Sequence, residues 1–198
     1  MPNISVKFNQ SIFNKNFNKN LDKNIFKKLA YRKMQSIFGI SKYNLLTRFR
    51  ESDITQEILS GPLAENISNT LDGYGNLFSF IGFNSSEPNP ILNFEEFLNK
   101  NITFQSTVRR DKTWYFKVNT PNEKEIADNS QMIWETDSWV LGIEDGISGL
   151  SHYMYKHWAN GYSKEGFQLP YENQDELNFS TKPYLRQMLK DFRESFNK

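Results

Sequence analysis

Residues 102–119 read ITFQSTVRR-DK-TWYFKVN and contain the clearest hairpin pattern in the chain. Polar and apolar side chains alternate in the first run, with Thr103 and Gln105 against Ile102 and Phe104. Asp111-Lys112 separates it from a second run rich in β-branched and aromatic residues. This pattern predicts two antiparallel strands, and the alternation indicates that one face of the sheet meets water.

Helical patterns lie on both sides of this hairpin. Apolar spacing from Leu21 through Ile25 and Leu29 predicts a helix that Gly39 ends, and a further helical stretch follows at 44–49. Another helix is expected from Asp53, with Asp53 and Gln56 as a capping box, to the break at Gly61-Pro62. Residues 91–98 also have helical spacing. The predicted fold class is therefore α+β, an antiparallel β-sheet packed against helices.

A final helix is expected over 182–196, with Thr181 as its N-cap and Pro183 in its first turn. Its predicted buried stripe is Tyr184, Leu185, Met188, Leu189 and Phe192. The run LFSFIGF at 77–83 is short and aromatic, and it predicts a strand buried on both faces. Residues 123–137 are acidic and predict a loop with a helical turn, and the glycines of 139–155 argue against one long helix there.

The domain organisation follows from these elements. Residues 1–20 are expected to form an extended arm in which Ile4, Val6 and Phe8 allow a short strand. Residues 21–198 are expected to form a single α+β domain, since 198 residues suffice for one core. Within it we expect N-terminal helices over 21–60, the sheet and loops over 72–180, and the C-terminal helix.

Charge is distributed very unevenly along the chain. The total is +1, but residues 1–50 carry 11 basic side chains and one acid, Asp22, which gives +10. Residues 51–198 carry 13 basic and 22 acidic side chains, which gives −9. Such a split indicates a basic segment that meets an anionic partner.

The basic segment alternates lysine and arginine with aromatic residues. We interpret it first as a cationic surface that docks on acidic protein, including the acidic part of this chain or of a neighbouring copy. Contact with nucleic acid through phosphates and stacked bases is the second interpretation, and a solvated face is the third. The candidate residues are Lys15, Lys19, Lys23, Lys27, Lys28 and Arg32.

Several classes of protein are disfavoured by the composition. Without cysteine there is no disulfide, thiolate metal site or cysteine nucleophile. No apolar run approaches the length of a membrane span, and the N-terminus lacks the apolar core of a signal peptide. His152 and His157 are five residues apart, a spacing that does not suit a helical metal pair. We therefore expect no cofactor, no metal and no membrane partner.

An acidic cluster is the one candidate for catalysis. Glu135, Asp137, Glu144 and Asp145 lie beside two tryptophans, and a carboxylate pair of this kind could serve glycoside hydrolysis. A solvated or interface face explains the same residues more simply. No nucleophile elbow or dinucleotide fingerprint accompanies them. The sequence thus favours a protein that is not an enzyme.

Three segments carry a resemblance to a known family. The first comprises ITQEI (54–58), GP (61–62), NISNTL (66–71) and GYGNLFSFIGF (73–83). The second is SWVLGIEDGISGL (138–150), and the third is KPYL (182–185) at the start of the last helix. In this order they resemble the neck or tail-completion proteins at the head–tail junction of tailed bacteriophages. The resemblance covers residues 50–196 and leaves the basic arm outside.

This resemblance implies a structural virion protein without catalysis, made in the host cytoplasm. It implies a six- or twelve-fold ring of identical subunits around the DNA channel, next to portal or adaptor proteins or to tail-terminator or tail-tube proteins. Non-specific contact with the DNA in the channel is also implied. Besides the basic residues, we expect subunit interfaces at or beside Tyr74, Phe78, Phe80, Phe83, Trp139, Glu144 and Asp145.

Overall fold

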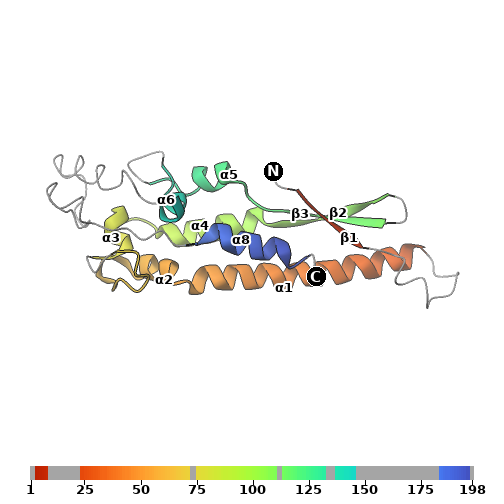
Figure 1. The fold of residues 1–198 in the computed structure, drawn as a ribbon, viewed down its shortest axis with the longest axis horizontal. Coiled ribbons are helices and arrows are strands. Elements are labelled where there is room, and N and C mark those ends of the chain that lie inside the picture. The colour runs from red at the N-terminus through yellow and green to blue at the C-terminus, as the bar shows by residue number, and fades with distance from the viewer. Residues whose placement is uncertain are drawn as a thin grey trace.

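The computed structural model describes residues 3–8, 23–71, 75–110, 113–132, 137–145 and 183–196. Its longest element is helix α1 (Lys23–Glu51), which runs along one side of the described structure, with shorter helices continuing beyond its C-terminal end (Figure 1). At about 1.5 Å per residue, this helix is about 43 Å long. A small sheet lies over its N-terminal half, and shorter helices cover its C-terminal half (Figure 1). The fold class is α+β, as the sequence predicts.

The sheet contains the predicted hairpin. Strands β2 (Thr103–Arg110) and β3 (Thr113–Asn119) pair antiparallel, with a register irregularity between Gln105 and Val108. Strand β1 (Asn3–Phe8) pairs antiparallel with the other edge of β3, so the order is β1-β3-β2. The short strand that the N-terminal alternation allows is therefore present, and it belongs to the sheet. Residues 9–22, with the rest of the expected arm, lie outside the described residues.

The remaining elements follow α1 along the chain. They are α2 (Asp53–Leu59), the 3-10 helix η1 (Gly61–Leu63), α3 (Leu77–Ile81), α4 (Pro90–Asn101), α5 (Glu123–Asp128), α6 (Trp139–Asp145) and α8 (Leu185–Glu194). The expected helices at 91–98 and at the C-terminus are present, as is the helical turn in the acidic segment. Helix α8 begins three residues later than expected, and Thr181, its expected cap, lies outside the described residues.

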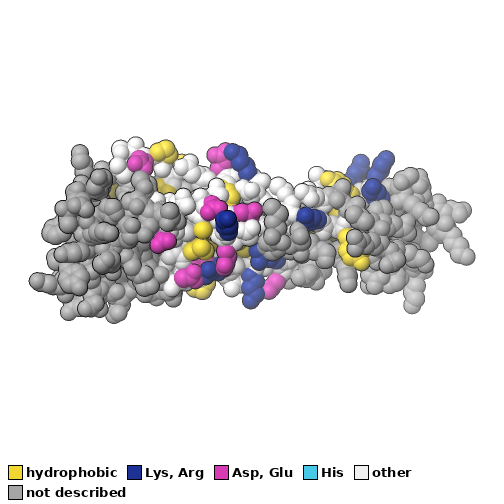
Figure 2. Space-filling view, turned by 90° about the horizontal axis from the view of Figure 1, so that it is seen from above, with side chains coloured by type: hydrophobic (Ala, Val, Ile, Leu, Met, Phe, Trp, Pro, Cys, Tyr) yellow, Lys and Arg dark blue, Asp and Glu magenta, His cyan; other side chains and the backbone are white. Residues whose placement is uncertain are grey.

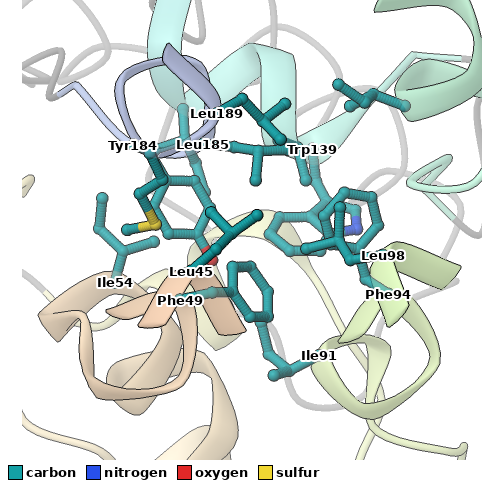
Figure 3. Packing of buried hydrophobic residues seen from close by; sticks show 14 of the residues in the cluster. Leu45, Phe49, Ile54, Ile91, Phe94, Leu98, Trp139, Tyr184, Leu185 and Leu189 are labelled. Carbon is teal, nitrogen blue, oxygen red and sulfur yellow. The ribbon is translucent and has the colours of Figure 1, made fainter. Parts of the chain in front are cut away.

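The core combines aliphatic and aromatic side chains and lies where α1, α4, α6 and α8 meet (Figure 3). Phe49 of α1 packs against Phe94 of α4 and Tyr184 at the start of α8, with ring centroids 5.8 and 5.7 Å apart. Phe94 in turn meets Trp139 edge to face at 5.6 Å. The predicted stripe of α8 is buried here: Tyr184, Leu185, Met188, Leu189 and Phe192.

The run at 77–83 corrects a prediction. It was expected to be a strand, but it forms helix α3, with Asn76 as N-cap and Gly82 in the left-handed conformation as C-cap. Leu77, Phe78 and Ile81 are all buried. A segment buried on all sides has no polar face, so periodicity cannot distinguish its helical from its extended form. The caps decide it.

Helix boundaries correct two further predictions. The cap of α2 is Ser52, whose hydroxyl accepts the N–H of Thr55, and not Asp53 with Gln56. Gly39 does not end α1, because Lys23–Glu51 is one continuous helix that passes through Gly39 and includes the predicted stretch at 44–49. Gly39 is exposed on that helix, and a Cβ atom built on it would meet nothing within 4 Å.

Gly39→Ala is therefore expected to raise the free energy of unfolding by about 0.5–1 kcal/mol, because alanine restricts the unfolded chain without a clash. Denaturant unfolding monitored by circular dichroism measures this gain. Gly61→Ala is the matched control and should destabilise the chain, since Gly61 has a φ of +80°. Equal effects of the two substitutions would contradict this account of Gly39.

Candidate interaction surfaces

Helix α1 presents apolar residues on two opposite faces. One face is buried and includes Met34 and Phe49. Ile25 lies nine residues before Met34, and Ile40 lies nine before Phe49. Because 3.6 residues make one turn, a separation of nine places side chains on opposite sides of the helix.

The second face is exposed. Its large apolar residues are Ile25, Leu29, Ile40 and Tyr43, and we call this set the α1 outer stripe. The spacing of Ile25 and Leu29 predicts the helix, and both side chains are exposed on it. The buried face of this half of the helix instead includes Ala30 and Met34.

The basic candidates fall into two groups. Lys27, Lys28, Arg32 and Lys33 are exposed on α1. By helical position Lys28, Arg32 and Lys33 lie beside or within the outer stripe, whereas Lys27 lies on the other side of the helix. Lys23 is the first residue of the same helix. Lys15 and Lys19 lie outside the described residues. In the face shown in Figure 2, the Lys and Arg side chains toward the end where α1 begins have no visible Asp or Glu neighbour, whereas over the middle of the molecule both charges are mixed.

The aromatic candidates belong to the interior of one chain. Phe78, Phe80 and Phe83 are buried, and only 2 % of Trp139 is exposed. Phe83 packs edge to face on Trp139 at 5.9 Å. These four side chains therefore support the fold from inside one chain, and a subunit interface at or beside them stays a prediction. Tyr74 lies outside the described residues.

The acidic candidates meet a partner that the sequence did not point to. Arg186, in the first turn of α8, donates its backbone N–H to Glu144 Oε1 at 2.6 Å. Its guanidinium binds both carboxylate oxygens of Asp145, with Nη2 to Oδ2 at 3.0 Å. Nε of Arg186 also reaches Glu123 Oε1 of α5 at 3.1 Å. One arginine thus connects α5, α6 and α8.

The two carboxylates of α6 differ electrostatically. The side chain of Glu144 is only 4 % exposed, and burial raises its pKa, although the N–H and charge of Arg186 act in the opposite direction. Asp145 is exposed, and its hydrogen bond from Arg186 lowers its pKa. Of the acidic cluster that the sequence offers for catalysis, Glu144 and Asp145 bind Arg186, Asp137 is exposed, and Glu135 lies outside the described residues.

A third surface is a loop between α2 and α3. Leu63 is 94 % exposed there, and Ile67 and Glu65 are also exposed. We call Leu63, Glu65 and Ile67 the η1 knob. Fixed polar contacts hold its base. Asn76 donates to the carbonyls of Pro62 and Ala64, at 2.9 and 3.0 Å.

Glu57 of α2 holds the same loop from within. It is fully buried, and its carboxylate accepts the N–H of Ser68 at 2.9 Å and the N–H of Leu77 at 2.6 Å. These bonds connect α2 to the loop at Ser68 and to the start of α3 at Leu77. Hydrogen bonds from Glu57 and Asn76 therefore fix the loop that carries the η1 knob.

A buried hydroxyl pair joins the first helices to the last one. Tyr184 Oη lies 2.5 Å from Thr55 Oγ1, and Thr55 Oγ1 also accepts from Ser52 Oγ at 3.0 Å. Burial raises the pKa of Tyr184 far above its ordinary value, so the phenol is neutral. This contact spans 129 residues of sequence.

Tyr184→Phe is expected to lower the free energy of unfolding by about 1–1.5 kcal/mol, because one buried hydrogen bond is lost while the ring packing remains. Thermal unfolding measures the change. Tyr43→Phe, on the exposed face of α1, is the matched control and should leave the melting temperature unchanged. A melting temperature equal to wild type in Tyr184→Phe would mean that this pair contributes nothing.

Two other classes of site were sought among the described residues. No group of three His, Asp or Glu side chains there is placed to hold a metal ion. No helix in the same part of the chain combines the length and apolar character needed to cross a membrane. The described chain also has an open hollow of about 190 Å³, lined by Phe83, Glu87, Asn93, Asn129 and Gln131 among others.

Comparison with known proteins adds no relative. No protein-family model, curated protein or solved structure matches the chain.

Proposed function

We propose that the chain is a structural protein of a tailed bacteriophage virion. In this proposal it forms a ring of identical subunits in the neck or tail-completion region and joins head to tail around the DNA channel. It acts by assembly and not by catalysis. Its other partners are the portal or adaptor proteins on one side and the tail-terminator or tail-tube proteins on the other.

One observation supports this proposal above the others. The three segments that resemble neck proteins are distant in sequence, yet each contacts another in the folded chain. Thr55 of the first segment meets Tyr184 of the third. Glu144 of the second binds the N–H of Arg186, the residue that follows the third. The resemblance therefore falls on residues that build one structural unit, as expected of a fold signature.

The charge pattern is a second support. Residues 23–50 contain eight basic side chains and no acidic one, whereas residues 51–101 contain eight acidic side chains and one basic, Lys100. Complementary surfaces at different places on one molecule suit repeated head-to-tail contacts, which close into rings when the rotation permits.

Imaging of the purified protein, alone and mixed with portal, adaptor and tail proteins, tests the proposal. We expect rings of six or twelve subunits, or a ring formed on one of those partners. A monomer that binds none of them would contradict it. Locating this subunit in an assembled particle would identify its layer.

A nucleic-acid-binding accessory protein is the second candidate, favoured by the exposed lysines and arginines of α1. In that case the phosphates of DNA are bound by Lys27, Lys28, Arg32 and Lys33. The protein alone, without any virion partner, should then shift duplex DNA in a gel. Combined replacement of these basic residues by glutamine would abolish the shift. Replacement of Lys124 on α5, also exposed, is the control and should have no effect.

A further inference from the structure

We propose that the η1 knob of one copy of this chain docks on the α1 outer stripe of the next copy. This inference names the contact between subunits and rests on the proposed assembly of identical copies. Ile67 belongs to the first segment quoted for the resemblance, whereas Leu63, Glu65 and the α1 outer stripe lie outside the quoted runs.

The first step is exposure. Leu63 is almost completely exposed, although leucine is usually buried, and Ile67 of the same loop is also exposed. Single exposed apolar residues are common, but these two stand on a loop fixed by Glu57 and Asn76. A loop whose conformation is already fixed loses little entropy on binding, which favours affinity.

The second step is the receiving surface. The α1 outer stripe has two exposed apolar pairs, Ile25 with Leu29 and Ile40 with Tyr43. The helix does not need them for its own core, since Met34 and Phe49 lie on the opposite side. The larger apolar side chains of the stripe project from a rigid helix. Such a face suits an apolar projection from a partner.

The third step is charge, which selects the occupant. Glu65 is the middle residue of the η1 knob, and Lys28, Arg32 and Lys33 flank the stripe. Among the described residues, no ion pair involves Glu65, Lys28 or Arg32. Two outer stripes facing each other would juxtapose like charges, because α1 has no acid before Glu51. The occupant that fits is therefore acidic and apolar, as the knob is.

The fourth step is geometry. The stripe begins at one end of the molecule, and the loop after α2 lies at the other (Figure 1). The two surfaces of one copy are therefore used by two different neighbours. A contact of this heterologous kind repeats from copy to copy.

The experiment uses three single substitutions in the full chain. Leu63→Glu disables the knob, and Leu29→Glu disables the stripe. Leu92→Glu, on an exposed leucine of α4 outside both surfaces, is the matched control. Sedimentation velocity over a concentration series measures self-association, and thermal unfolding checks that all three variants fold as the wild type does.

We expect Leu63→Glu and Leu29→Glu each to weaken self-association at least about tenfold, since each buries a charge against an apolar surface. Leu92→Glu should associate like the wild type. An equimolar mixture of Leu63→Glu and Leu29→Glu should form a one-to-one dimer and nothing larger, because the mixture retains one intact knob and one intact stripe per pair. A dimer from the mixture is specific to a head-to-tail contact.

Three outcomes would overturn the inference: a wild type that stays monomeric, unchanged association of either disabled variant, or a mixture that forms no dimer. Retention of DNA by wild type that Leu29→Glu loses would assign the stripe to nucleic acid instead. The proposed function fails separately. Rings that persist in Leu63→Glu overturn only this contact, whereas open filaments that bind no virion protein, with the expected mixed dimer, overturn only the neck ring.

Discussion

Glu57→Leu is expected to lower the free energy of unfolding by about 4 kcal/mol, the largest effect of any single substitution considered. The substitution leaves the backbone N–H groups of Ser68 and Leu77 buried without their acceptor. Each hydrogen bond to a charged group contributes about 1.5–3 kcal/mol, and an unsatisfied buried donor costs about 1–3 kcal/mol. For a chain of this size, the melting temperature should fall by about 10 °C.

Glu57→Gln should cost about half as much. Its amide oxygen can accept one of the two N–H groups, while its NH2 group faces the other donor. Glu65→Gln, on an exposed glutamate of the same loop, is the matched control and should not change stability. Hydrogen exchange adds a local measurement, since the amides of Ser68 and Leu77 should lose protection in Glu57→Leu before the core does. Normal protection of both amides would contradict the assigned role.

The second large effect is expected at Arg186. Arg186→Ala removes the side chain that connects α5, α6 and α8, and leaves Glu144 buried beside Asp145 without a cation. The free energy of unfolding should fall by about 2 kcal/mol at neutral pH. This value is below that of a fully buried ion pair because Arg186 and Asp145 are exposed. Lys190→Ala, an exposed cation on the same helix, is the control and should have little effect.

The pH dependence distinguishes this explanation from a simple loss of packing. Burial already raises the pKa of Glu144, and loss of Arg186 should raise it further. A carboxyl group with a raised folded-state pKa destabilises the fold above its unfolded pKa, and protonation on acidification relieves this. The stability difference between wild type and Arg186→Ala should therefore narrow from pH 7 to pH 5.

A direct check is the double variant Glu144→Gln with Arg186→Ala. It should recover much of the stability lost in Arg186→Ala, because a neutral amide has no charge to desolvate. A stability difference that stays constant with pH, or a double variant as unstable as Arg186→Ala, would show that the ionised Glu144 is not the cause.

The parts of the fold that follow local rules are predictable from sequence. The hairpin is fixed by the alternation on its two strands and by the polar pair between them. Helices α4 and α8 each have one apolar stripe, so their burial follows from periodicity. In these elements a polar, solvent-exposed face is clearly distinct from an apolar, buried one.

The predictions for α1 and α3 are wrong because these helices lack the contrast between one apolar and one polar face. Helix α3 is buried on every side, and α1 is apolar on two opposite sides, so neither has one apolar face. The useful signals were instead the caps Asn76 and Gly82 of α3. In α1, the cost of Gly39 within a helix, about 1 kcal/mol, is offset by the packing of residues on both sides of it.

The candidate surfaces were predictable only in part. The exposure of Lys27, Lys28 and Arg32 follows from their charge. Arg186 could not be assigned to the acidic pair, because 41 residues separate it from Asp145 and nothing local links them. Likewise, the sequence shows that Phe80 and Trp139 are large and apolar, but only the tertiary arrangement decides that they pack within one chain. The extreme exposure of Leu63 has no sequence signal at all.

The contacts of α1 and β1 with distant parts of the chain affect how fast the chain can fold. The buried face of α1 is completed by α8, as Ser41 bonds Ser195 across 154 residues of sequence. Strand β1 can form its sheet only with β3, since Asn3 pairs with Asn119. Segments early in the chain therefore pack on segments far along it, and contacts so distant in sequence make folding slow. Before these contacts form, Phe38 and Phe49 of the cationic helix α1 lack the rings of Phe192 and Tyr184 that cover them in the folded chain.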